Sequence, residues 1–139
     1  MKKIFVTLIL AFTLSPVFAQ ESTEPFHAYL INKEYSVYLR IDFHHESITV
    51  PGQDLYGKLP GFFSKQHNSF CWLITSAEVD GKTATLQMIN DYGSEDLTAT
   101  LTIDNDSVYV LKQIAGSTLK VPNNGKWQKL PKTLEFKRQ

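Results

Sequence analysis

Alternation of apolar and polar residues with a period of two runs through much of this chain, and it constrains the fold more than any other feature. The clearest run is YSVYLRIDF at residues 35–43, and LTATLTID at 97–104 repeats it with threonines in the polar places. ATLQM at 84–88 follows the same rule. Successive side chains of a β-strand point to opposite faces, so such runs predict strands with one buried face.

Turn-forming residues separate these runs. DGK at 80–82 and DNDS at 104–107 are typical of tight hairpins, while YGSED, AGS and PNNGK supply Gly or Asn where a positive φ is needed. No window predicts an amphipathic helix. The strands are predicted at 26–32, 35–43, 47–51, 54–59, 70–79, 83–90, 97–104, 107–114, 117–121 and 132–138.

These elements predict an all-β fold, a single-domain antiparallel meander of about 8–10 short strands that forms a small β-barrel or β-sandwich. A meander of this size tends to close, because closure removes exposed strand edges. The 139 residues allow one domain with its own core.

The N-terminus has the features of a cleavable secretion signal. Lys2 and Lys3 precede an apolar run at 4–14 that is too short to span a bilayer, and Ala19 offers a cleavage site before Gln20. No cysteine follows that site closely, so a lipoprotein signal is absent. We expect a periplasmic or secreted protein with no membrane span after cleavage. The expected division is a signal peptide at 1–19, a flexible lead-in at 20–25 and a β domain at 26–139.

The charge of the mature chain argues against nucleic acid as a partner. Removal of Lys2 and Lys3 from the 14 basic residues leaves 12 against 14 acidic ones, a formal charge of −2, and nucleic-acid binders usually carry a basic excess. The charge is uneven, however. Residues 78–106 hold seven acids against Lys82, and residues 112–138 hold seven bases against Glu135. Such asymmetry is a hint about partners.

The acidic stretch MINDYGSEDLTATLTIDND does not form one site. Its carboxylates fall into two groups, one before and one after the strand at 97–104, which would span about 25 Å. Residues 104–106 faintly resemble the start of a calcium loop, but Tyr109 stands where that loop needs Gly. We therefore expect two separate acidic loops and no metal site there.

Candidate catalytic and metal-binding residues lack a constellation. Cys71 in SFCWLI has the surroundings of a buried core residue, and one cysteine can form no internal disulfide. Ser94 has acids beside it rather than a histidine. The histidines are expected in solvated loops, with the pair at 44–45 in a turn, and they predict no zinc site; they are His27, His44, His45 and His67. An enzyme, such as a small hydrolase, is therefore not favoured, and no cofactor is expected.

The aromatic residues leave two interpretations open. Phe62 and Phe63 are adjacent, so in an extended segment they cannot both face one core. One of them is then exposed, covers a barrel end or enters a ligand cavity. Trp127 is flanked by Lys126 and Lys129, which fits either an ordinary surface covered by lysine stems or a platform for stacking a glycan or small molecule.

The favoured function is a non-catalytic binding protein that neutralises or chaperones another extracytoplasmic protein. The partner would contact an acidic loop made of Tyr92, Ser94, Glu95 and Asp96. In size, compartment and class the chain is similar in outline to periplasmic lysozyme inhibitors and immunity proteins, although the cysteine bridges of some such inhibitors are absent. The alternative is a lipocalin-like carrier that holds a small apolar ligand inside the barrel. Its candidate ligand-binding residues are Phe62, Phe63, Trp72 and Trp127.

Overall fold

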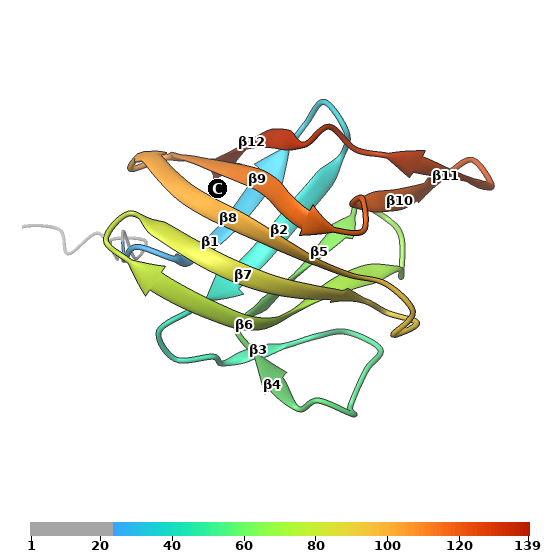
Figure 1. Ribbon diagram of the computed structural model, residues 1–139, viewed down its shortest axis with the longest axis horizontal. Helices are drawn as coiled ribbons and strands as arrows, with labels where there is room; N and C mark the ends of the chain where they lie inside the picture. Colours follow the sequence, from blue (N-terminus) through green and yellow to red (C-terminus); the bar gives the residue numbers. More distant parts are fainter. Residues whose placement is uncertain (1–23) are drawn as a thin grey trace, which may run out of the picture.

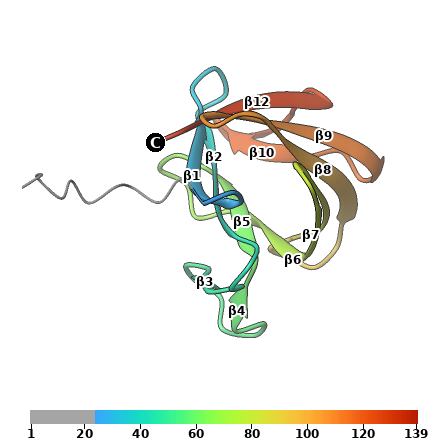
Figure 2. The same ribbon diagram turned by 90° about the vertical axis from the view of Figure 1, so that its left-hand side faces the viewer.

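The chain forms a closed antiparallel barrel of eight strands, to which two small hairpins are attached (Figure 1, Figure 2). The structure, a computed structural model, describes residues 24–139. The predicted signal peptide at 1–19 and residues 20–23 of the predicted lead-in lie outside the described residues. Between residues 24 and 139 there is no helix with the length and apolar character needed to cross a membrane.

The barrel strands follow one another around the barrel in chain order, and β12 returns to pair with β1. They are β1 (His27–Asn32), β2 (Val37–Asp42), β5 (Gly61–Lys65), β6 (Cys71–Asp80), β7 (Thr83–Asn90), β8 (Asp96–Asn105), β9 (Val108–Gly116) and β12 (Thr133–Arg138). Two hairpins interrupt this order: β3 (Ile48–Thr49) with β4 (Lys58–Leu59), and β10 (Lys120–Asn123) with β11 (Lys126–Lys129). The predicted all-β meander is confirmed, and it closes as a barrel.

The period of two is realised in the long hairpins. In β8 the residues Leu97, Ala99 and Leu101 are buried inside the barrel, and the threonines between them are only partly buried. The predicted turns are also confirmed. Gly81 joins β6 to β7 with a positive φ, and Asn124 and Gly125 have positive φ in the β10–β11 turn, as the two central residues of a primed hairpin turn require.

Aromatic side chains fill the barrel interior. The largest fully buried ones are Trp72, Tyr109, Phe26, Phe63 and Phe136. Phe26, which lies just before β1, stacks on Phe43 at 5.4 Å between ring centroids and meets Tyr109 edge-on at 5.8 Å. Rings of this size each remove a large apolar area from water, so they dominate the hydrophobic stabilisation of a small barrel.

Of the three alternatives for the Phe62–Phe63 pair, exposure of one ring is wrong, because both rings are buried in β5. Phe63 points into the barrel core. Phe62 points outward and belongs to a second hydrophobic cluster with Val50, Leu59 and Leu73, which the β3–β4 hairpin helps to cover. Alternation in the sequence predicts one buried face for each strand. Here a hairpin buries the other face as well.

Several segments depart from the predicted strands. The strand predicted at 47–51 is reduced to Ile48–Thr49, and the one predicted at 117–121 is shifted to Lys120–Asn123. Residues 61–65, treated as a loop, form β5, and β11 was not predicted. Of the predicted strand at 54–59, only Lys58–Leu59 is extended, because Gly57 has a positive φ and the Tyr56 N–H donates to the Gln53 side chain within a turn. These segments either form the attached hairpins or pack beneath one of them. There, tertiary contacts decide the backbone conformation more than the alternation of apolar and polar residues does.

Burial of both rings predicts that each one stabilises the fold. We expect Phe62→Ala and Phe63→Ala each to lower the free energy of unfolding by about 3 kcal/mol, since each removes a buried ring and leaves a cavity. Leu55→Ala is the control, because Leu55 is 85% exposed and its loss should change stability by less than about 0.5 kcal/mol. Urea unfolding measures all three. A Phe62→Ala variant as stable as Leu55→Ala would show that the outer cluster does not form.

Candidate functional site

The predicted partner-binding loop connects β7 to β8, and buried Asn90 fixes its shape. The Asn90 Oδ1 accepts hydrogen bonds from the N–H groups of Ser94 at 2.9 Å and Glu95 at 3.3 Å. The Asn90 Nδ2 donates to the Ser94 hydroxyl at 3.0 Å. Gly93 supplies the positive φ of the turn. Ser94 is therefore held as part of the loop scaffold, while Tyr92 projects from the loop and is 73% exposed.

One carboxylate of this loop is already paired within the chain. The Glu95 Oε2 lies 3.0 Å from the Lys120 Nζ, and that ammonium also lies 5.4 Å from the centroid of the Trp127 ring. Asp91 and Asp96 are exposed, and within residues 24–139 neither forms an ion pair. The loop is thus less acidic than its composition suggests, and its unpaired charge resides on Asp91 and Asp96.

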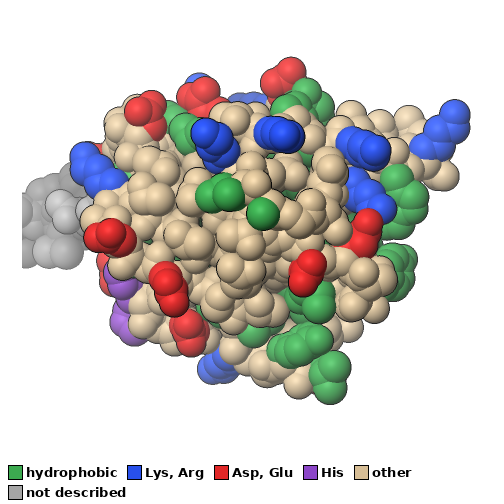
Figure 3. Space-filling view, viewed as in Figure 1, with side chains coloured by type: hydrophobic (Ala, Val, Ile, Leu, Met, Phe, Trp, Pro, Cys, Tyr) green, Lys and Arg blue, Asp and Glu red, His purple; other side chains and the backbone are tan. Residues whose placement is uncertain are grey.

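Three aromatic rings from separate parts of the chain meet beside this loop. Phe70, from the β5–β6 connection, lies 5.7 Å from the Tyr92 ring and 4.9 Å from the Trp127 ring. Phe70 is buried, whereas Trp127 is 49% exposed. We call Phe70, Tyr92 and Trp127 the aromatic platform. Figure 3 shows hydrophobic side chains gathering at the end of the molecule where the β10–β11 hairpin lies, beneath a row of Lys and Arg side chains.

A hydrogen bond from the core residue Trp72 joins the β10–β11 hairpin, which carries Trp127, to the barrel. The indole Nε1 of Trp72 donates to the Lys120 carbonyl at 2.9 Å, and Trp72 meets Phe70 edge-on. Sequence reasoning assigned Tyr92 and Trp127 to two competing functions. The structure brings them together, because the end of β7 and the β10–β11 turn lie at the same end of the barrel (Figure 1).

The structure does not bring the four candidate ligand-binding residues into one cavity. Phe63 and Trp72 lie in the barrel core and have no exposed area. Phe62 lies in the outer cluster, and Trp127 lies on the platform.

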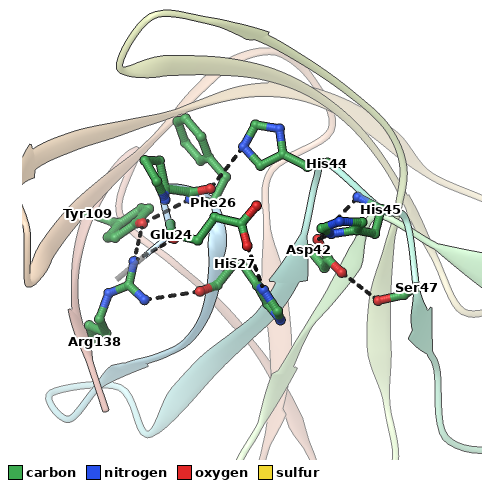
Figure 4. A network of polar contacts seen from close by, with 10 residues as sticks. Glu24, Phe26, His27, Asp42, His44, His45, Ser47, Tyr109 and Arg138 are labelled. Atoms are coloured by element: carbon green, nitrogen blue, oxygen red, sulfur yellow. Dashed lines mark hydrogen bonds and ion pairs between the residues drawn. The ribbon is translucent and has the colours of Figure 1, made fainter. Parts of the chain in front are cut away.

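At the opposite end of the barrel, the Arg138 side chain donates hydrogen bonds to several oxygen atoms (Figure 4). Its guanidinium donates to the carbonyls of Glu24 and His27, both at 3.0 Å, and to the Tyr109 hydroxyl at 2.8 Å. That hydroxyl also accepts the buried N–H of Phe26 at 3.1 Å. The network satisfies backbone groups where β1 begins, and buried groups of this kind are costly to leave unpaired.

Three of the four histidines lie at this end, and His67 lies at the other. Each of the three contacts a different oxygen: His27 with Glu24 at 3.3 Å, His44 with Pro25 at 3.0 Å, and His45 with Asp42 at 3.1 Å (Figure 4). The rings of His27 and His45 are 6.3 Å apart. In the described part of the chain, no group of three or more His, Cys, Asp or Glu side chains is placed to hold a metal ion. The predicted turn at 44–45 is confirmed.

Two groups have shifted pKa values. Burial raises the pKa of the Cys71 thiol to about 11, and the nearby charge of Asp91 adds to this effect. Cys71 is therefore a neutral, buried side chain, as the sequence predicted. For Asp42, burial raises the pKa, but hydrogen bonds from Ser47 at 2.5 Å and from His45 outweigh it, so the pKa lies below the ordinary 3.8.

Comparisons with models of known protein families, with curated proteins and with solved structures found no match in any of the three. A functional proposal therefore has to rest on the geometry of these side chains.

The lowered pKa of Asp42 predicts a pH-dependent contribution to stability. The unfolded chain binds a proton at this carboxyl more tightly than the folded chain does. The stabilisation is therefore complete above the ordinary pKa and is lost as the pH falls through the lower folded value. We expect Asp42→Asn to cost about 1–2 kcal/mol at neutral pH. This cost should shrink in acid.

Urea unfolding of the native chain and of Asp42→Asn across the acid range measures that difference. Asp80→Asn is the matched control, because Asp80 is an exposed carboxylate at the end of β6. A difference that stays constant from neutral pH to about pH 2 would contradict the linkage.

Proposed function

We propose that this chain is a non-catalytic binding module that acts outside the cytoplasm and holds another protein through the aromatic platform and the adjoining acidic loop. The observation that carries the proposal is the placement of two exposed rings, Tyr92 and Trp127, on one buried ring, Phe70. Exposed Trp and Tyr side chains concentrate binding energy in protein interfaces when a partner removes them from water.

The platform is organised before any partner arrives. Trp127 is held by Phe70 and by the Lys120 ammonium, and Tyr92 projects from a loop that Asn90 shapes with three hydrogen bonds. Side chains that are already ordered lose little conformational freedom on binding, so more of the contact energy is available as affinity.

The unpaired carboxylates beside the platform support a partner with a basic surface. Asp91 and Asp96 flank Tyr92 in the sequence and are both exposed. Charges at the rim of an interface steer encounter and fix its register rather than supply most of the affinity. A basic extracytoplasmic protein, such as an antibacterial enzyme that this chain would neutralise, has the matching chemistry.

The alternatives have less support from the geometry. A carrier would place its ligand where Phe63 and Trp72 now pack against other core side chains, so those side chains would have to move. For hydrolysis, the Ser94 hydroxyl accepts from the Asn90 amide rather than donating to a histidine, and the Cys71 thiol is buried and neutral.

Removal of the two exposed rings should abolish most of the partner's affinity. We expect Tyr92→Ala with Trp127→Ala to weaken binding at least about tenfold per ring, since buried interface aromatics are frequent hot spots. The partner is the polypeptide that accompanies the mature protein in a native mass spectrum after gentle purification from its own host. Titration of that partner with each variant gives the affinity.

Val79→Ala is the control, because Val79 is a partly exposed apolar residue near the far end of β6 from the platform. The double variant Glu95→Lys with Asp96→Lys tests the acidic loop, and unchanged affinity would remove that loop from the interface. An extra mass of a few hundred daltons in place of a polypeptide would favour the carrier.

A further inference from the structure

Next to the platform, a pocket of ≈ 320 Å³ opens on the outside of the barrel, between the β3–β4 connection and the strands β2, β5 and β6. Its walls include two aromatic side chains, Tyr38 and Phe62, and one carboxylate, Asp91. No Lys, Arg or His is among its lining residues. A volume of this size is within the usual range of small-ligand and side-chain pockets.

The aromatic wall of the pocket packs against other aromatic rings. The rings of Tyr38 and Phe62 meet edge-on at 5.8 Å, and Phe62 is locked in the outer hydrophobic cluster. Tyr38 in turn meets Tyr29 edge-on at 5.7 Å, and the Arg40 guanidinium lies 4.5 Å from the centroid of the Tyr29 ring. The electron-rich face of such rings attracts cations.

Asp91 supplies the negative charge of the pocket. Its N–H donates to the Cys71 carbonyl at 3.0 Å, which places Asp91 beside another lining residue of the pocket. Asp91 and Cys71 both line the pocket, and the Cys71 thiol is neutral because burial and the Asp91 charge raise its pKa. Within residues 24–139, no basic side chain forms an ion pair with Asp91.

Two of the other surface pockets contain basic side chains, and a third, beside Tyr35, has one aromatic side chain with Glu34 and Glu135. One, beside β1 and β2, contains Arg40 and Arg138. Another contains Lys33 and Lys137 together with acidic side chains. The pocket at Asp91 combines aromatic walls with a carboxylate that no cation balances, and this is the combination that recognises an ammonium or guanidinium group.

We infer that this pocket receives a lysine or arginine side chain of the partner protein. The inference rests on the proposed function and extends it. Asp91 lines the pocket and Tyr92, the next residue, belongs to the platform, so one partner surface reaches both. The partner therefore presents a basic side chain beside the apolar patch that covers Tyr92 and Trp127. The Tyr38 ring contacts the stem of that side chain, and Asp91 accepts a charge-assisted hydrogen bond from its head.

The test uses two small probes with the same four-carbon side-chain stem on the mature protein. N-acetyl-lysine methylamide carries the cation, and N-acetyl-norleucine methylamide lacks it. Amide shifts in nitrogen-15 NMR spectra follow their binding. We expect the lysine probe to give saturable shifts at Gly52, Cys71 and Asp91, and the norleucine probe to bind at least about tenfold more weakly.

Two variants assign that binding to the named groups. Asp91→Asn should weaken the lysine probe about tenfold, and Tyr38→Leu should weaken it about threefold or more. Asp80→Asn loses the same charge at the other end of β6 and should leave the affinity unchanged. Equal binding of the two probes, full affinity in Asp91→Asn, or no saturable shift in the pocket with either probe would overturn the inference.

The same variants separate failure of this inference from failure of the proposed function. If Tyr92→Ala with Trp127→Ala loses the partner while Asp91→Asn keeps both the partner and the lysine probe, the platform binds and the pocket does not. If the lysine probe binds through Asp91 while the platform variants keep every partner, the pocket is a cation site and the proposed function is wrong. A small organic cation found in the native mass spectrum would identify a free ligand as the occupant.

Discussion

The pairing of β12 with β1 closes the barrel, and the rest of the structure depends on that closure. It is the shortest pairing in the barrel, with only Leu30 opposite Arg138 and Ile31 opposite Lys137. Side chains supplement it. The Arg138 guanidinium binds the backbone on both sides of the start of β1, and Asn32 donates to the Glu135 carbonyl at 2.9 Å. Without closure, β1 and β12 would be two open sheet edges around an exposed aromatic core.

The barrel is a scaffold, and the two hairpins that interrupt its meander give the surface its distinctive features. The β3–β4 hairpin buries Phe62 and forms one side of the pocket at Asp91. The β10–β11 hairpin brings Trp127 to Phe70 and Lys120 to Glu95. Both hairpins contribute residues beside the loop that joins β7 to β8. Binding residues carried on excursions from a rigid sheet are a common arrangement, since the sheet fixes where the excursions begin and end.

The alternation of apolar and polar residues predicts those strands whose formation depends on neighbouring residues alone. The strands at 83–90 and 97–104 followed from alternation, because the period of a strand depends only on neighbouring residues. The double burial of the Phe62–Phe63 pair did not follow, since it needs a hairpin whose position is set by tertiary packing. The charge asymmetry was read as a sign of a partner, yet one acid of the first group, Glu95, pairs with Lys120 of the second group. Sequence composition counts charges and cannot show which of them cancel within the fold.

The Glu95–Lys120 ion pair narrows the chemistry that the proposed partner would need. If every acid of the loop were unpaired, a diffuse basic patch would suffice. With Glu95 neutralised by Lys120, the unpaired negative charge of the loop lies at Asp91 and Asp96, which precede and follow the exposed Tyr92 in the sequence. A complementary surface then needs an apolar centre with basic groups at defined positions around it, and unpaired charges discriminate against surfaces that lack those groups. The network at Arg138 lies at the opposite end, so the side chains that close the barrel are separate from those proposed to bind.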